Sequence, residues 1–376
     1  HIYDVVGKAD IKVSKESKLA IKNKNDALFY DRKEFKYNIF IPSPHIGFNP
    51  DDGIILGPQL KVTRHGFKKA PYKSQHTFAA NYTFKAEGVN FNYSSDFIEL
   101  FGKIDFGTSV EFNLPKVYQF YGQGNETSLE KSNVGKSPIR LSNYNFGTQF
   151  GVSSDDLSRR LSATLNYQIL DVDELPVVVP EFDKLKAQQF IVGGLRYTYK
   201  NIVNESNPSR GIKFDVCLEN TRSLLNADVD YTEVSSEFSI YVPINYFRKQ
   251  TTFAARTGFS TLIGEYNFYQ ANFVGGTKEM RGLTRNRFAG KTVSYSNFEL
   301  RRSFFKVKNY IVPFDFGIIG HFDIARVWVN NDVSEKWHNS YGGGIYVSIL
   351  DFLSLAGTYS ISDVNKTVNV GTNFYF

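Results

Sequence analysis

From about residue 38 onward, apolar and polar residues alternate along segments that polar turns separate. In 143–153, Tyr144, Phe146 and Phe150 occupy even positions, whereas every odd position is Asn, Gly, Gln or Ser. Successive side chains of a β-strand point to opposite faces, so the alternation predicts strands with one apolar and one polar face. Segments 211–219, 233–244 and 253–263 repeat the pattern, and the first of them places Cys217 on the polar, inward face.

The spacing of these segments predicts an all-β fold, a transmembrane antiparallel β-barrel of about sixteen strands. The expected strands are 40–49, 52–64, 75–86, 89–100, 103–120, 141–153, 160–171, 187–200, 210–223, 232–245, 251–264, 291–305, 314–329, 341–350, 352–361 and 366–376. A soluble β-sandwich also alternates, but many of these strands are long enough to cross a bilayer at a tilt. Within 291–305, Val293 and Tyr295 have the opposite parity to Phe298 and Leu300, which predicts a bulge or lumenal aromatic side chains.

Composition agrees with a barrel and excludes other classes. No run of about 18 apolar residues is present, so no transmembrane helix is expected. The net charge is +6, but Lys and Arg are scattered, and nucleic acid is not an expected partner. Residues 1–37 are charged and lack a period, so we expect a polar linker or approach segment there and the barrel in 38–376. The chain starts at His1 without a leader, and a targeting segment is expected to have been removed or to lie outside this sequence.

The end of the chain resembles the recognition signal of outer-membrane barrels, a final strand that ends on an aromatic residue. Its signal residues are Asn369, Gly371, Phe374 and Phe376, and the parity of the strand directs Phe374 and Phe376 outward. Insertion machinery reads such a strand by edge pairing. This resemblance implies the bacterial outer membrane as location, and the lipid and the barrel assembly machinery as partners.

The long connection before residue 291 carries Gly275 and Gly276 followed by Arg281 and Gly282. It resembles the conserved loop of the BamA superfamily of outer-membrane insertases and transporters, in which two glycines precede Val-Arg-Gly-Phe/Tyr. Met280 and Leu283 depart from that pattern conservatively, and Ala325 stands where the family usually has Gly. Four further segments match family motifs in order: 120–127, 207–211, 298–301 and 322–328.

The resemblance implies that this loop folds into the barrel lumen and that Arg281 meets carboxylates of the wall. Asp323 is the expected partner, and Glu299 is a second candidate. Arginine suits this role because its planar guanidinium stays charged and can hold a carboxylate through two hydrogen bonds. Gly282 is expected to let the backbone turn tightly.

The resemblance also implies a lateral seam at which the first and last strands pair weakly, marked here by Pro42, Pro44 and Phe376. Proline removes ladder donors, which suits a poorly paired edge strand, although it could merely shape the start of the strand.

The leading functional hypothesis is a barrel that inserts or translocates polypeptides at the outer membrane, with client polypeptides or accessory outer-membrane subunits as further partners. Family members usually carry periplasmic POTRA domains, and 1–39 is too short for one. The sequence around 49–53 and 336–338 resembles short barrels that form the C-terminal part of longer proteins. The alternative functional hypothesis is therefore an anchor or export barrel for an upstream patatin-like or metallophosphatase domain. A passive porin is a third reading. The six His residues show no metal-ligand spacing, no catalytic constellation is visible, and neither an enzyme activity, a metal nor a cofactor is expected.

Overall fold

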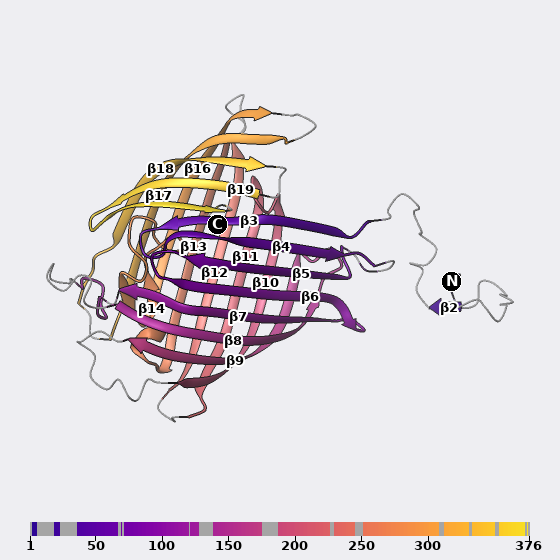
Figure 1. Ribbon diagram of the computed structural model, residues 1–376, viewed down its shortest axis with the longest axis horizontal. Helices are drawn as coiled ribbons and strands as arrows, with labels where there is room; N and C mark the ends of the chain where they lie inside the picture. Colours follow the sequence, from indigo (N-terminus) through magenta and orange to yellow (C-terminus); the bar gives the residue numbers. More distant parts are fainter. Residues whose placement is uncertain are drawn as a thin grey trace.

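The structure is a computed structural model that describes residues 2–5, 19–22, 36–66, 69, 71–119, 121–127, 138–174, 187–225, 229–244, 251–307, 312–330, 333–349, 353–372 and 374. Sixteen strands form one closed antiparallel barrel, which confirms the predicted fold class (Figure 1). Each barrel strand pairs with its neighbours along the chain, and β20 closes the ring on β3. Because β20 and β3 are antiparallel, β20 runs toward the end of the barrel at which β3 starts. That this end faces the periplasm is a prediction.

The barrel strands are β3 (Ile39–Asn49), β4 (Gly53–Arg64), β5 (Ser74–Thr83), β6 (Gly88–Phe101), β7 (Ile104–Gln119), β8 (Pro138–Ser153), β9 (Arg159–Glu174), β10 (Gln188–Val203), β11 (Arg210–Ser223), β12 (Asp230–Ile244), β13 (Thr251–Glu265), β16 (Thr292–Val307), β17 (Phe314–Trp328), β18 (His338–Ile349), β19 (Leu353–Ser362) and β20 (Lys366–Thr372). Outside the barrel, β1 (Ile2–Val5) pairs in parallel with β2 (Leu19–Lys22). Among the described residues, no helix is long and apolar enough to span a membrane.

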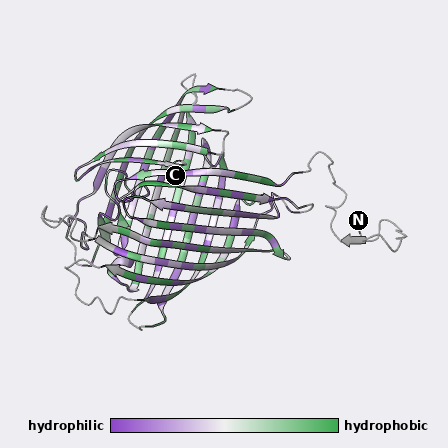
Figure 2. Cartoon of the chain, in the orientation of Figure 1, coloured by the Kyte–Doolittle hydropathy of each residue, from purple (hydrophilic) through white to green (hydrophobic). Residues whose placement is uncertain are grey.

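The alternation of side chains sorts the two faces of the wall (Figure 2). In β16, Phe298 is 38 % exposed on the outer face, whereas Tyr295 is only 5 % exposed on the inner face. Val293 and Tyr295 are thus lumenal, one of the two outcomes expected for this strand, and the register shift lies further along, between Ser303 and Phe305. Cys217 is buried and in register with Arg196 and Ser235, so it lies on the inward face as predicted.

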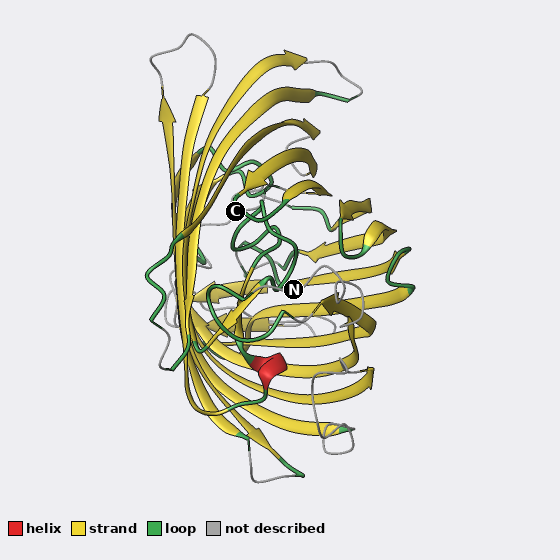
Figure 3. Ribbon diagram, turned by 90° about the vertical axis from the view of Figure 1, so that its left-hand side faces the viewer, coloured by secondary structure: helices red, strands yellow, loops and turns green. Residues whose placement is uncertain are grey.

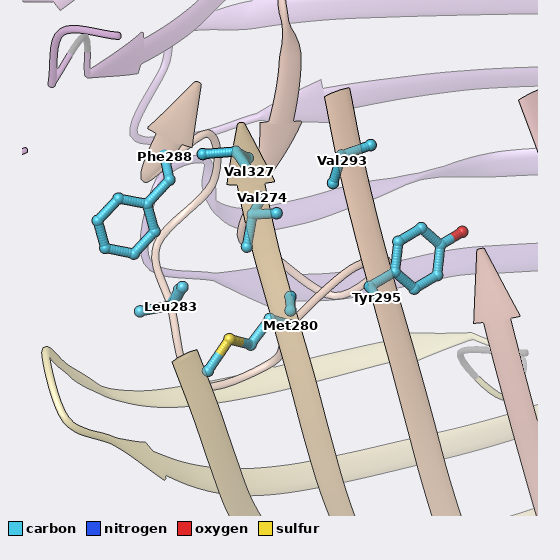
Figure 4. Packing of buried hydrophobic residues seen from close by; sticks show 8 residues of the cluster. Val274, Met280, Leu283, Phe288, Val293, Tyr295 and Val327 are labelled. Carbon is cyan, nitrogen blue, oxygen red and sulfur yellow. The ribbon is translucent and has the colours of Figure 1, made fainter. Parts of the chain in front are cut away.

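The lumenal loop, residues 266–291 between β13 and β16, folds back into the space that the strands enclose (Figure 3). It contains the short helix η3 (Phe268–Gln270) and two short paired strands, β14 (Asn272–Val274) and β15 (Phe288–Gly290). Met280, Leu283 and Phe288 of the loop pack against Val293 of β16 and Val327 of β17 in one buried cluster (Figure 4). This apolar contact fixes the loop against the wall near its charged tip.

Candidate functional site

Two glycines give the lumenal loop its sharp reversal. Gly275 has φ +130° and Gly276 has φ +87°, in the left-handed region where only glycine is unstrained. A Cβ atom on Gly275 would lie 2.1 Å from the carbonyl oxygen of Thr284. The backbone N–H of Gly276 donates to the carbonyl of Leu283 at 3.1 Å, which closes the turn and presents Arg281 to the wall.

The structure brings Arg281, Asp323 and Glu299 together. The Arg281 Nε donates to Oδ2 of Asp323 at 2.9 Å, and its Nη2 donates to Oδ1 of the same carboxylate at 2.5 Å. The Arg281 Nη1 donates to Glu299, and its backbone N–H donates to Asp323 at 3.1 Å. All three side chains are 1 % exposed or less. The planar guanidinium thus bridges β16 and β17 through two carboxylates at once.

A second arginine balances the charge of this buried group. Arg301 lies two residues after Glu299 on the same inward face and donates from Nε to its Oε2 at 2.7 Å. Two cations therefore face two anions, and Asn297 adds a hydrogen bond of 3.0 Å to Asp323. Sequence reasoning did not assign Arg301 to the site, although its parity with Glu299 was a usable signal.

The backbone of the loop tip, Arg281–Gly282, is held by the last strands of the barrel. The side chain of Asn369 donates to the carbonyl of Arg281 at 3.2 Å, and the Thr367 hydroxyl donates to the same oxygen. Ser362 donates to the Gly282 carbonyl at 2.9 Å. A Cβ on Gly282 would lie 2.5 Å from that of Ser340, and this glycine does not have a positive φ. Close packing, and not the expected tight turn, therefore requires glycine here.

An outer segment, residues 121–127 from the β7–β8 connection, covers the other side of the loop. Asn125 is 1 % exposed and donates to the Ser334 hydroxyl at 3.0 Å and to the Lys336 carbonyl at 2.8 Å. Its side-chain oxygen accepts from the Val327 N–H at 3.2 Å, and its carbonyl lies 2.7 Å from His338 Nε2. Asn125 therefore ties the segment to β17, to β18 and to the connection between them.

Further contacts join the outer segment to the lumenal loop. Gly124 donates to the Ala289 carbonyl at 2.8 Å, and Arg287 donates to the Thr127 carbonyl at 2.6 Å. The sequence flagged 120–127 as a motif, but it gave no partner for Asn125, which lies about two hundred residues from its contacts. At the same rim, Asp363 accepts a hydrogen bond from Lys336 at 2.6 Å. Burial alone would raise the pKa of Asp363, but Lys336 and His338 hold it below its usual value.

The seam between β3 and β20 is weakly paired over the described residues. Val370 and Phe48 are its one register pair, whereas β3 pairs with β4 along its whole length. Phe374 corrects the sequence prediction, because it turns inward. Its ring lies 5.0 Å from that of Tyr346 and 4.1 Å from the Arg301 guanidinium carbon. Pro42 and Pro44 lie in β3, with exposed side chains. Phe376 lies outside the described residues, and Gly371 has open space where a Cβ would be.

The loop leaves part of the lumen open. A cavity of about 730 Å³ lies between the loop and the inner face of β10 to β13. Its wall carries opposed charges: Lys213 lies 3.6 Å from Glu237, and Arg196 lies 3.8 Å from Asp215. Lys278 of the loop lines the opposite side. Among the residues that the structure describes, no group of His, Cys, Asp and Glu is arranged to hold a metal ion.

Solved structures share this barrel. BamA from Haemophilus ducreyi lacking POTRA domains 1–3 is similar with a TM-score of 0.61 and 14 % identity, over 90 % of this chain and 71 % of that one. CdiB from Escherichia coli has a TM-score of 0.57 and 12 % identity over 89 % of this chain, and CdiB from Acinetobacter baumannii has 0.55 and 11 % over 90 %. The chain spans only 63 % and 59 % of these two CdiB chains. A search of curated proteins gave no match.

The Omp85 superfamily domain matches residues 75–349, most of the chain. That range contains the lumenal loop, Arg281 and both of its carboxylate partners. The predicted family is therefore confirmed: the chain is an outer-membrane β-barrel and belongs to the Omp85 superfamily.

Proposed function

We propose that this barrel inserts or translocates polypeptides at the outer membrane, and that its wall opens at the seam between β3 and β20. The weak seam is the observation that carries the proposal. Every other pair of neighbouring barrel strands forms an extended ladder, but this one has a single register pair among the described residues. An unpaired strand edge presents N–H and C=O groups that another polypeptide can bind.

The filled mouth supports a lateral route over passive diffusion. The lumenal loop is anchored by a buried ion pair at its tip and by the outer segment near its end. A porin needs an open water-filled lumen. In the proposed function the client polypeptide meets the seam, the membrane lipid surrounds the opening, and the assembly machinery inserts the barrel itself.

A disulfide across the seam tests the proposal. Phe48→Cys and Val370→Cys would be made in a Cys217→Ser background, since register partners lie within disulfide reach. Oxidation is expected to lower the level of other outer-membrane or secreted proteins in cells, and reduction to restore it. Tyr359→Cys with Val368→Cys, a register pair between β19 and β20, is the matched control. Unchanged client levels with the seam locked would contradict the proposal.

The second candidate, an anchor or export barrel for an enzyme domain, is favoured by Pro42 and Pro44. Proline on an edge strand discourages pairing with other strands. An insertase needs such pairing with its client, whereas an anchor does not. In the same experiment this function predicts that locking the seam leaves other outer-membrane proteins at normal levels.

A further inference from the structure

We propose that Pro42 and Pro44 keep the seam unzipped, and that the lumen contains a binding site for an aromatic side chain that Phe374 occupies. The inference concerns how the two ends of the barrel wall are held. It does not depend on which polypeptide, if any, the barrel handles.

The register of β3 shows which edge its prolines face. Pro44 pairs with Pro58 of β4. Two prolines have no N–H to exchange, so this can only be a non-hydrogen-bonded pair, in which Ser43 and His45 bond to β4. The even-numbered residues of β3 direct their backbone N–H and C=O groups to its other edge, which faces β20. The nitrogens of Pro42 and Pro44 therefore face β20.

The same argument explains the neighbouring ladder. If Pro44 and Pro58 form a non-hydrogen-bonded pair, the nitrogen of Pro58 faces β5. The β4–β5 register indeed has no pair at Gly57 or Pro58, between Leu56 and Gln59. Each proline thus removes a donor from one identifiable ladder, and those of Pro42 and Pro44 belong to the seam.

Extending the seam register shows what these donors would have bound. Val370 lies opposite Phe48, so a continued β20 would place Phe374 opposite Pro44 and Phe376 opposite Pro42. The missing donors lie beyond the last described register pair, four and six residues along β3 from Phe48. The last described contact on this line is Thr372 Oγ1 with His45 Nδ1, at 3.4 Å. Beyond it, β3 offers carbonyl acceptors but no N–H at two successive positions.

The lumen offers the aromatic residue a better environment. The Arg301 guanidinium lies over the Phe374 ring at 4.1 Å, and Tyr346 meets the ring edge to face. Ile319 and Ala356 complete the apolar side. Arg301 is 2 % exposed and already oriented by Glu299 and by the Pro208 carbonyl at 3.3 Å. A fixed, desolvated guanidinium makes a stronger cation–π contact than a mobile one at the surface.

Tryptophan fluorescence in brominated lipid tests the placement of residue 374. Phe374→Trp would be made with Trp328→Phe and Trp337→Phe, so that one indole reports. With both prolines present, the indole is expected in the lumen and only weakly quenched. Pro42→Val with Pro44→Val restores both N–H donors to the edge of β3 that faces β20. We expect β20 to extend, the indole at position 374 to move to the outer face, and quenching by the bromine atoms to rise.

Pro58→Val is the matched control, because it restores a donor that faces β5 and not the seam. It should leave quenching at the parent level. If the double variant does not fold, Pro44→Val alone, opposite residue 374, should produce the same rise. Strong quenching in the parent, or no change in a folded Pro44→Val variant, would overturn the inference. A negative result with the seam disulfide would not affect it, since quenching reports position and not client handling.

Discussion

Arg281 brings a full positive charge into the interior of the barrel, where an unpaired ion is strongly disfavoured. The structure offsets this with two carboxylates and with Arg301, so that the group as a whole is neutral. Most of the hydrogen bonds involved join charged partners, which makes them stronger than neutral ones. Removing one member leaves the others buried and unbalanced, which costs more than the group as a whole contributes.

Arg281→Ala is therefore expected to destabilise the barrel by about 3–5 kcal/mol, because Asp323 and Glu299 lose their shared partner. Arg281→Lys should recover only part of this, since an ammonium cannot hold a carboxylate through two parallel bonds. Thermal unfolding in detergent measures both. Arg285→Ala is the control, because that side chain pairs with Asp52 and is 27 % exposed. It should cost about 1 kcal/mol or less. Equal losses for Arg281→Ala and Arg285→Ala would argue against a buried charge network.

Asn125 supports a separate prediction at the rim. Asn125→Ala leaves the buried N–H of Val327 without its acceptor, and we expect a loss of roughly 1–3 kcal/mol. The outer segment should then become sensitive to limited proteolysis while the barrel stays folded. Glu126→Gln, next along the chain, keeps an acceptor for Ser334 and should remain resistant. Equal cleavage of the two variants would show that Asn125 does not hold the segment.

At the scale of elements, β20 has two neighbours of different kinds. Its outer edge meets β3 in the weak seam, whereas its inner face holds the loop tip through Thr367 and Asn369. The sequence predicts that Asn369 belongs to an assembly signal, and that role remains a prediction. The contact with the loop tip is a separate observation. Loop tip and seam strand share hydrogen bonds, so a change in one should alter the other.

Hydrogen exchange can detect this coupling in both directions. Arg281→Ala should speed exchange in β20 more than in β4. Thr367 and Asn369 of β20 bind the backbone carbonyl of residue 281, and without the Arg281 side chain that backbone is no longer fixed to the wall. Asn369→Ala should speed exchange at the loop tip, although it leaves the carboxylate partners intact. Asn339→Ala, an exposed asparagine of β18, should do neither. If Arg281→Ala left β20 unchanged, the loop and the seam strand would be independent.

The strands were predictable because alternation is a local property. All sixteen predicted strands are present in the predicted order. The start of β18 was missed because His338 to Ser340 is polar on both faces, and Ser340 faces the loop instead of open water. Phe374 was misplaced because parity assumes that a strand continues. The end of β20 depends on its pairing with β3, more than three hundred residues away in the sequence, and a local pattern cannot show where that pairing stops.

At the scale of the whole molecule, the barrel is a wall around an occupied lumen. The loop tip is fixed to β16 and β17, the outer segment covers the loop, and a charged cavity of about 730 Å³ remains beside β10 to β13. Charged side chains of the wall and Lys278 of the loop line this space. The lumenal loop lies inside the ring of strands, near the centre of the view in Figure 3.

Conductance in planar bilayers tests whether the loop closes the lumen. The intact barrel should show low conductance, because ions must pass around an anchored loop. Replacing residues 277–286 with a short Gly-Ser linker removes the tip and should raise the conductance severalfold, since an emptied barrel of sixteen strands encloses an aqueous channel. Arg281→Ala should lie between the two and flicker, as the tip detaches and rebinds. Arg285→Ala, which leaves the tip anchored, should match the intact barrel. High, steady conductance in the intact protein would instead favour a passive porin and would remove the reason for a lateral route.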